Sequence, residues 1–287
     1  MPLPSVPLEG GLRLTGRTFA APEGLPLVSI VTVVLNGQKH LRQTIESVLG
    51  QTYPYVEYII LDGGSTDGTL DIIRAYNDRL AYWRSAPDAG IYAAMNEGIS
   101  LCTGTLIGLK NADDWYTPHA VADVVKTWQA TGAGFVYGDT LVVWQEEPLQ
   151  TSLFRSDHHR IGRDGGVDHR TVFATQALYA RHRYDTRYRI CADYDWYLQI
   201  VSAGGQFAHT GSVISYKRPG GASASPQTLK DAFAINRKYF GLAYALRVRA
   251  RQAWVQLYMG LVNTTLRTLL GAEGLARFKA RKLKQSS

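Results

Sequence analysis

The sequence predicts an α/β fold with a mostly parallel sheet, helices on both faces of that sheet and a C-terminal helical appendage. Strand-like and helix-like segments alternate four times within 27–116, a pattern typical of an open parallel sheet. The first strand-like segment, 28–35, reads VSIVTVVL, a continuous apolar and β-branched run expected of a strand that is buried on both faces. From residue 229 onward the pattern is helical.

Apolar spacing and turn residues justify the elements of the first half. Leu41, Ile45 and Val48 fall on one helical face, so we expect a helix over 39–49 after the Asn36-Gly37 break. By the same criteria we expect strands at 56–61, 80–83 and 106–109, and helices at 69–76 and 90–102.

The second half has weaker periodicity. We expect, in order, a helix at 121–129, a strand at 135–143, a polar loop at 158–166, a return to the sheet within 171–179, a helix at 191–202 and a last strand at 213–216. Residues 1–26 are rich in proline and glycine and are expected to form an extended arm. A basic amphipathic helical tail, 226–287, then leaves 27–225 as the folded domain.

The net charge of +7 lies almost entirely in the tail. Residues 241–287 contain nine Lys or Arg and one Glu, which gives +8, whereas the rest of the chain contains 22 basic and 23 acidic residues, which gives −1. A body without a basic stripe argues against a nucleic-acid partner. The first strand–helix junction also lacks the G-x-G-x-x-G pattern of dinucleotide-dependent dehydrogenases.

Cysteine usage and the N-terminus bear on the compartment. Cys102 and Cys191 are far apart and have no ligand-like neighbours, so we expect neither a disulfide framework nor a zinc site. The opening MPLPSVPLEG lacks the basic and apolar regions of a secretory signal, and no stretch reaches the roughly 20 apolar residues that span a bilayer. We therefore expect a cytoplasmic protein, with the tail available for a peripheral contact at the inner face of the plasma membrane.

Polar clusters follow three of the expected strands: Asn36, the segment DGGSTDGT at 62–69, and NADDW at 111–115. The carboxyl ends of parallel strands share one rim of the sheet, where ligands of such sheets bind. Two adjacent carboxylates, Asp113 and Asp114, are costly without a cation or donors facing them, and oxygen ligands suit Mn²⁺ or Mg²⁺. The alternative is that one of them caps a following turn.

Two further segments have both a structural and a functional interpretation. The glycines of 62–69 allow a ligand to approach the backbone, and Asp62 could accept a hydrogen bond from a base or ribose, but the segment equally suits a well-capped turn. Asp88 and Tyr92 bracket the start of the helix expected at 90–102, where Asp88 also suits a cap. Asn96 on that helix could face the sheet edge or solvent.

Together these segments resemble glycosyltransferase family 2, the large GT-A (Rossmann-like) group of inverting enzymes. VSIVTVVLNG resembles the opening strand, and Gln51-Thr52-Tyr53, DGGSTDGT, GIYAAMNEGI and NADDW follow in the family's order. The resemblance is close over 27–115. It continues more weakly through His169-Arg170 and CADYDW to Gly220-Gly221-Ala222-Ser223, and bacterial members that build surface polysaccharides are the most similar.

The resemblance divides the domain into a nucleotide-sugar half, 27–116, and an acceptor half, 117–225. It implies that Asp113 and Asp114 bind Mn²⁺ or Mg²⁺, with Asn111 and Gly63 at positions where many relatives carry Asp. The residues implied to line the nucleotide-sugar pocket are Val33 (through its backbone), Asn36, Asp62, Asp88, Tyr92, Asn96 and Asn111.

The resemblance also implies that Asp193 is the catalytic base. Inversion needs one carboxylate that removes the acceptor hydroxyl proton as the oxygen attacks the anomeric carbon, while the metal stabilises the departing diphosphate. Asp195 is the rival candidate, but residues two apart on a helix differ by about 200°, so only one of them can face the cleft. A carboxylate that stabilises the helix start is the alternative role for either.

On the acceptor side, His169 and Arg170 resemble the family's His-containing motif, and Arg170 could hold a phosphate with two hydrogen bonds. Ordinary solvated polarity is the alternative for both. Trp196 could stack on a sugar, although aromatic residues on a helix more often belong to the core. In the tail, basic residues flank an apolar stretch, which suits either a helix in an anionic membrane interface or a helix packed on the domain.

We therefore expect an inverting transferase, of the hexosyl or N-acetylhexosaminyl class, that acts in polysaccharide biosynthesis. Its donor would be a nucleotide sugar, with UDP favoured over GDP and dTDP, and its acceptor a saccharide or lipid-linked saccharide. The alternative is a non-catalytic GT-A-like scaffold of a polysaccharide assembly complex. The presence of the Asp113-Asp114 pair and of Asp193 favours the enzyme.

Overall fold

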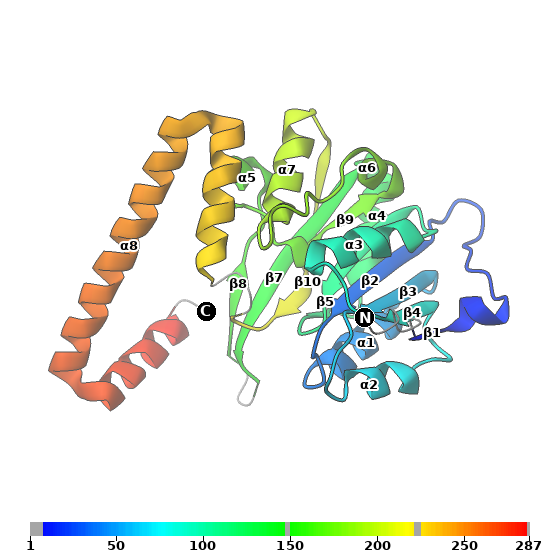
Figure 1. Ribbon diagram of the computed structural model, residues 1–287, viewed down its shortest axis with the longest axis horizontal. Helices are drawn as coiled ribbons and strands as arrows, with labels where there is room; N and C mark the ends of the chain where they lie inside the picture. Colours follow the sequence, from blue (N-terminus) through cyan, green and yellow to red (C-terminus); the bar gives the residue numbers. More distant parts are fainter. Residues whose placement is uncertain (1–7, 147–149, 221–224, 286–287) are drawn as a thin grey trace, which may run out of the picture.

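The computed structural model describes residues 8–146, 150–220 and 225–285, which form one mixed sheet covered by helices on both faces and a long C-terminal helix (Figure 1). The strand order is β1-β4-β3-β2-β5-β9-β7-β10-β6, and β8 pairs with β7. This architecture confirms the predicted fold class. Residues 221–223, which contributed to the weaker part of the family resemblance, lie outside the described residues.

The first four predicted strands form the parallel part of the sheet. They are β2 (Val28–Val34), β3 (Val56–Asp62), β4 (Tyr82–Ser85) and β5 (Leu106–Asn111). β2 pairs in parallel with both β3 and β5, and every one of its residues is buried. This central position explains why β2 reads as a continuous apolar run rather than an alternating one.

Alternate residues of β2 contribute to two separate cores. Val28 and Ile30 belong to one core, with helices α1 (Leu41–Leu49), α2 (Thr69–Ala75) and α4 (Ala120–Thr131). Val31 and Val33 belong to the other, with α3 (Ile91–Leu101), α6 (Gln176–Arg181) and α7 (Ala192–Ser202). Since successive side chains of a strand point to opposite faces, the helices lie in two layers around the sheet.

The acceptor half extends the same sheet. β9 (Phe173–Thr175) is antiparallel to both β5 and β7 (Phe135–Gln145), whereas β10 (Phe207–Lys217) is parallel to β7. The structure adds elements that the sequence did not predict, because they are short or weakly patterned: β6 (Trp115–Tyr116), β8 (Gln150–Phe154), and within the expected polar loop η2 (His158–Arg160) and α5 (Ile161–Asp164).

The N-terminal arm takes part in the sheet. β1 (Leu8–Gly10) pairs antiparallel with β4, and η1 (Leu12–Thr15) follows it. Arg13 in η1 forms an ion pair with Glu57 of β3, whose side chain is fully buried. The arm therefore covers an edge of the sheet over its described part, which begins at residue 8.

The tail forms α8 (Pro226–Gln285), which reverses direction twice in Figure 1. Gly241 has φ 83°, in the left-handed region that favours glycine, and accounts for a sharp bend. Before this bend the helix is tied to the domain: Lys238 forms an ion pair with Asp195 of α7. No helix in the described part of the chain is both long and apolar enough to cross a membrane.

Candidate active site

A cavity of about 770 Å³ opens at the carboxyl ends of β2 and β5, a volume suited to a small organic ligand. It is bounded by the end of β2, the start of α3, the end of β5, the turn η3 (His169–Thr171) and the segment that leads into α7. The sequence-predicted residues that line it are Val33, Asn36, Asp88, Tyr92, Asn111, Asp113, His169, Arg170 and Asp193. Residues from both halves thus meet at the rim where parallel sheets bind ligands.

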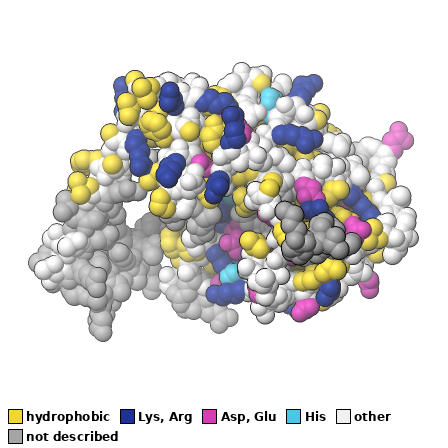
Figure 2. All heavy atoms as spheres, viewed as in Figure 1, with side chains coloured by type: hydrophobic (Ala, Val, Ile, Leu, Met, Phe, Trp, Pro, Cys, Tyr) yellow, Lys and Arg dark blue, Asp and Glu magenta, His cyan; other side chains and the backbone are white. Residues whose placement is uncertain are grey.

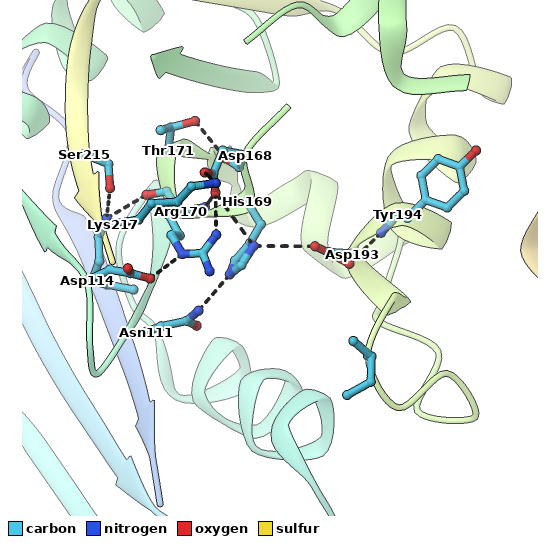
Figure 3. Close-up of polar contacts among 12 residues, drawn as sticks. Asn111, Asp114, Asp168, His169, Arg170, Thr171, Asp193, Tyr194, Ser215 and Lys217 are labelled. Atoms are coloured by element: carbon cyan, nitrogen blue, oxygen red, sulfur yellow. Dashed lines mark hydrogen bonds and ion pairs between the residues drawn. The ribbon is translucent and has the colours of Figure 1, made fainter. Parts of the chain in front are cut away.

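Asn111, His169 and Asp193 form a row along this cavity (Figure 3). The Asn111 amide Nδ2 donates to His169 Nε2 over 3.1 Å, and His169 Nδ1 lies 3.5 Å from Asp193 Oδ2. Because an amide nitrogen only donates, Nε2 must accept, so the ring proton lies on Nδ1 and faces Asp193. Burial and, after it, the nearby Arg170 guanidinium lower the pKa of His169 to about 3, so the ring stays neutral.

Asp193 has the environment of a general base. Its side chain is 25% exposed, and Oδ1 accepts hydrogen bonds from the Tyr194 backbone N–H (2.9 Å) and the Tyr92 hydroxyl (3.1 Å). Burial raises the pKa of Asp193 above its usual value, while these donors and the Arg170 charge oppose the shift. A carboxylate whose pKa is raised accepts a proton more readily at neutral pH.

These contacts predict a pH effect for Tyr92→Phe. The Tyr92 hydroxyl also donates to the Ile190 carbonyl (2.6 Å), so Asp193 receives only part of this bond. Removing a donor to the charged carboxylate disfavours the charged form, so the pKa of Asp193 should rise further above its usual value. Activity, which needs the carboxylate, should then be lost at a higher pH as the solution is acidified. The acidic limb of the kcat/KM profile measures this shift, and an unmoved limb would contradict it.

Arg170 binds two carboxylates beside this row (Figure 3). Its Nε donates to Asp114, and its Nη1 donates to Asp168 over 2.9 Å. Lys217 at the end of β10 also contacts Asp168, with Nζ to Oδ2 at 3.0 Å. Burial alone would raise the pKa of Asp168, but Arg170 and Lys217 hold it well below its usual range.

This network bears on two predictions. Asp114 is 1% exposed and does not line the cavity. One of its oxygens is held by Arg170, and the other, Oδ1, is buried with no hydrogen-bond partner among the described residues, so Asp113 is the carboxylate of the pair that lines the cavity. Arg170 does line the cavity, but its guanidinium is engaged by two carboxylates rather than free to grip a phosphate with two hydrogen bonds. The sequence could not show that a residue 56 positions away neutralises Asp114.

Arg170→Gln should strongly destabilise the fold. The substitution leaves two buried carboxylates, Asp114 and Asp168, without their shared guanidinium, and breaking a buried pair costs about 3–5 kcal/mol. Urea denaturation measures the loss in the free energy of unfolding. Arg189→Gln, a change at an exposed arginine on the cavity rim, is the matched control and should cost under about 0.5 kcal/mol. Equal stabilities of the two variants would contradict this role of Arg170.

A buried lysine fixes the turn that carries Arg170. Lys110 on β5 donates to the Arg170 carbonyl (2.9 Å) and to Ser215 Oγ on β10 (2.7 Å), and its Nζ lies 3.7 Å from the centre of the Tyr116 ring. Burial lowers the pKa of Lys110. These contacts connect β5, η3 and β10, and so they fix the backbone of His169 and Arg170 beside the cavity.

Two predicted acceptor-side residues on α7 do not reach the cavity. Asp195 is fully buried and binds Lys238 of α8 (2.7 Å) and Gln199 (2.8 Å). Trp196 is also fully buried, stacks on Tyr179 and donates to the His182 carbonyl. Both predictions are therefore corrected: these side chains hold α7 in the core, and Asp193 is the α7 carboxylate that lines the cavity.

Two predicted nucleotide-pocket residues have structural roles as well. The Asp62 carboxylate is 2% exposed and accepts hydrogen bonds from Ser65 and from Ser85 Oγ (2.6 Å), so it organises the turn after β3 instead of lining the cavity. The Asn96 side chain donates to the Tyr184 carbonyl (2.9 Å) and accepts from the Tyr184 N–H (3.1 Å). Asn96 thereby ties α3 to the acceptor half, which is not the ligand contact that the resemblance implied.

The remaining oxygen ligands fit a divalent cation. Asp113 lines the cavity, and Asn111 Oδ1 is buried with no hydrogen-bond partner among the described residues. A carboxylate and an amide oxygen at one rim match the hard ligands that Mg²⁺ and Mn²⁺ prefer. The donor set thus fits a metal at Asp113, with Asn111 as a neighbouring oxygen.

The sequence missed several cationic residues that line the cavity, namely Lys39, Arg189 and Lys217. Lys217 directly follows the last strand predicted from the sequence, 213–216, and β10 is parallel to β7. Its position at the carboxyl end of a strand was therefore the available signal. Arg189 lies in an irregular segment before α7, where no periodicity indicates the direction of a side chain.

Comparison with known proteins shows the family of the chain. The model of glycosyl transferase family 2 matches residues 29–184, more than half of the chain. This chain belongs to glycosyl transferase family 2. It is similar to a PGL/p-HBAD biosynthesis glycosyltransferase of Mycobacterium bovis, with 31% identity over 212 residues that cover 69% of this chain and 79% of that protein. An uncharacterized glycosyltransferase of Mycobacterium tuberculosis is 38% identical over 109 residues, which are 37% and 42% of the two chains.

Solved structures show the same GT-A fold. The mannosyltransferase PcManGT from Pyrobaculum calidifontis, in complex with GDP-Man and Mn²⁺, aligns with a TM-score of 0.61 at 15% identity over 96% of this chain and 85% of that chain. TarS 1–349 of S. aureus in complex with UDP-GlcNAc aligns with a TM-score of 0.57 at 14% identity, over 74% of this chain and 65% of that chain. This family 2 chain is therefore a glycosyltransferase with a GT-A fold.

Proposed function

We propose that this family 2 enzyme is an inverting transferase that moves a hexosyl or N-acetylhexosaminyl group from a nucleoside-diphosphate sugar to a saccharide or lipid-linked saccharide. The observation that carries this proposal is that Asp113, His169 and Asp193 all line one cavity. Those residues come from both halves of the domain, so donor and acceptor groups can be held at one place. We further propose a role in polysaccharide biosynthesis.

The donor end of the cavity suits a nucleoside diphosphate. Val33, Asn36 and Asp88 supply its walls, and the Asn36 turn is fixed because its Oδ1 accepts from the Thr66 N–H (2.9 Å). Lys39 and Arg189 place positive charge on the rim, where it attracts phosphate oxygens. A bound Mn²⁺ or Mg²⁺ at Asp113 would neutralise charge on the departing diphosphate. UDP is our first candidate nucleotide, since a UDP-GlcNAc complex is known for a protein of the same fold, and GDP is the second.

The acceptor end of the cavity performs the proton transfer. Asp193 accepts the proton of the acceptor hydroxyl as that oxygen attacks the anomeric carbon. His169, neutral and held by Asn111, keeps its Nδ1 proton toward Asp193 and so fixes the carboxylate orientation. The attack comes from the side opposite to the diphosphate, so the anomeric configuration inverts.

A thermal-shift panel of nucleotide sugars, with and without Mn²⁺, tests the proposal. The correct donor at a hundredfold excess over its Kd should raise the free energy of unfolding by about 2.7 kcal/mol, and the shift should need Mn²⁺. Product analysis on the same samples should then detect release of the nucleoside diphosphate and, with acceptor, an inverted linkage. Tight donor binding without any release of nucleoside diphosphate would instead indicate a binding scaffold.

A further inference from the structure

The part of α8 beyond Gly241 presents an apolar strip to solvent. Its members are Leu246 (52% exposed), Trp254 (63%) and Leu257 (65%). At about 100° per residue these three side chains lie within about 80° of one another around the helix axis. Figure 2 shows hydrophobic and basic side chains interleaved over α8, in its upper left part. Contiguous exposed apolar surface of this kind marks an interaction site.

The opposite side of the same helix is the better-covered one. Ala245 is buried, and Val248 and Gln252 are partly buried. These three residues lie within about 60° of one another and roughly opposite the apolar strip. This part of α8 therefore packs on its neighbours through a narrow side, while its apolar strip faces solvent.

Three exposed arginines border the apolar strip. Arg249 lies on one side of it, and Arg247 and Arg251 lie on the other. A long basic side chain beside apolar surface can extend its charged head toward phosphate while its stem stays with the apolar groups. Trp254 also stacks on Tyr258, with ring centres 5.4 Å apart, and such aromatic residues favour the boundary between lipid and water.

We propose that the apolar strip and its three arginines dock α8 on an anionic lipid surface. The charge of the chain favours lipid over a second copy of the protein, because residues 241–287 carry +8 and two such segments repel each other. The part of α8 before Gly241 is anchored to the domain by the Lys238–Asp195 ion pair. Docking of the later part of α8 on lipid would therefore hold the whole domain at the lipid surface. Docking on lipid does not depend on the proposed function. Only its purpose, access to a lipid-linked acceptor, rests on that function.

Vesicle co-sedimentation of the full chain tests the docking. The protein should bind vesicles of phosphatidylcholine mixed with phosphatidylglycerol and not pure phosphatidylcholine, and added salt should weaken binding. Replacing Arg247, Arg249 and Arg251 by Gln should lower the affinity roughly a hundredfold, since each basic residue near such a surface contributes about fivefold. Trp254→Ser with Leu257→Ser should lower it at least about tenfold.

Matched controls use exposed residues on the domain. Replacing Arg79, Arg181 and Arg183 by Gln removes the same charge, and Trp144→Ser removes an exposed aromatic side chain (46% exposed) on β7. These controls should bind anionic vesicles as the unmodified chain does. Equal losses in the control and tail variants, or equal binding to neutral vesicles, would overturn the proposal.

Two further readouts separate the alternatives. A dimer in analytical ultracentrifugation that dissociates in the Trp254→Ser, Leu257→Ser variant, without vesicle binding, would assign the strip to a second copy and overturn the lipid assignment. Transfer to a soluble acceptor should be unchanged in every tail variant. Absence of transfer in the unmodified chain would refute the proposed function, yet it would leave the vesicle result intact.

Discussion

Asp193→Asn should lower kcat for glycosyl transfer about 10²–10⁴-fold while donor affinity stays within a factor of a few. The amide has nearly the shape of the carboxylate but cannot accept the acceptor proton, and a positioned base contributes about this factor. Donor binding should persist because Asp193 belongs to the acceptor half, whereas the residues proposed to hold the nucleotide, Val33, Asn36 and Asp88, belong to the donor half. Initial rates at saturating donor, together with calorimetric titration of the donor, measure the two quantities separately.

Asp195→Asn is the matched control for Asp193→Asn, because it changes the other carboxylate near the start of α7. Asp195 is buried against Lys238, so its loss should reduce stability and leave kcat per folded molecule close to that of the unmodified enzyme. If Asp195→Asn abolished turnover and Asp193→Asn did not, the assignment of the base would be wrong. Folding of each variant is checked by circular dichroism before rates are compared.

Asp113→Asn should weaken the apparent affinity for Mn²⁺ by at least about 100-fold. Mutation of a residue that only orients a metal ligand already lowers metal affinity about 10–100-fold. Asp113 should matter at least as much, because it is the carboxylate of the Asp113-Asp114 pair that lines the cavity. Activity should fall with it and recover partly at high Mn²⁺ concentration. Rates measured over a range of Mn²⁺ concentrations give the apparent affinity.

Asp114→Asn is the matched control for the metal assignment. It weakens the ion pair with Arg170 and should lower the free energy of unfolding, with little change in the Mn²⁺ concentration that gives half-maximal activity. The reverse pattern, with Mn²⁺ affinity lost in Asp114→Asn and kept in Asp113→Asn, would contradict the assignment of the metal to Asp113.

The fold of the donor half could be predicted from the sequence because each of its elements is specified by residues that are close together in the chain. β2 is buried on both faces, so its composition alone predicts a central parallel strand, and the polar residues that follow β2 and β5 had to meet at one rim. Likewise, the 200° separation of Asp193 and Asp195 on a helix required that only one of them face the cavity. Asp193 does, and Asp195 points into the core.

The side-chain roles that the sequence did not predict depend on partners that are distant in the chain. Whether Asp114 binds a cation or an arginine is decided by Arg170, which η3 brings beside it, and no periodicity indicates that contact. Asp62 and Asn96 have motif-like positions, yet serines and the Tyr184 backbone satisfy their side chains.

A crystal structure of the enzyme with Mn²⁺ and its nucleoside diphosphate, with the metal located by anomalous scattering, tests the account most directly. We expect Mn²⁺ bound at Asp113 next to the diphosphate, with Asp193 lining the same cavity. A metal bound instead at the Asp157, His158 and His159 cluster, or a nucleotide lying outside the cavity, would contradict it.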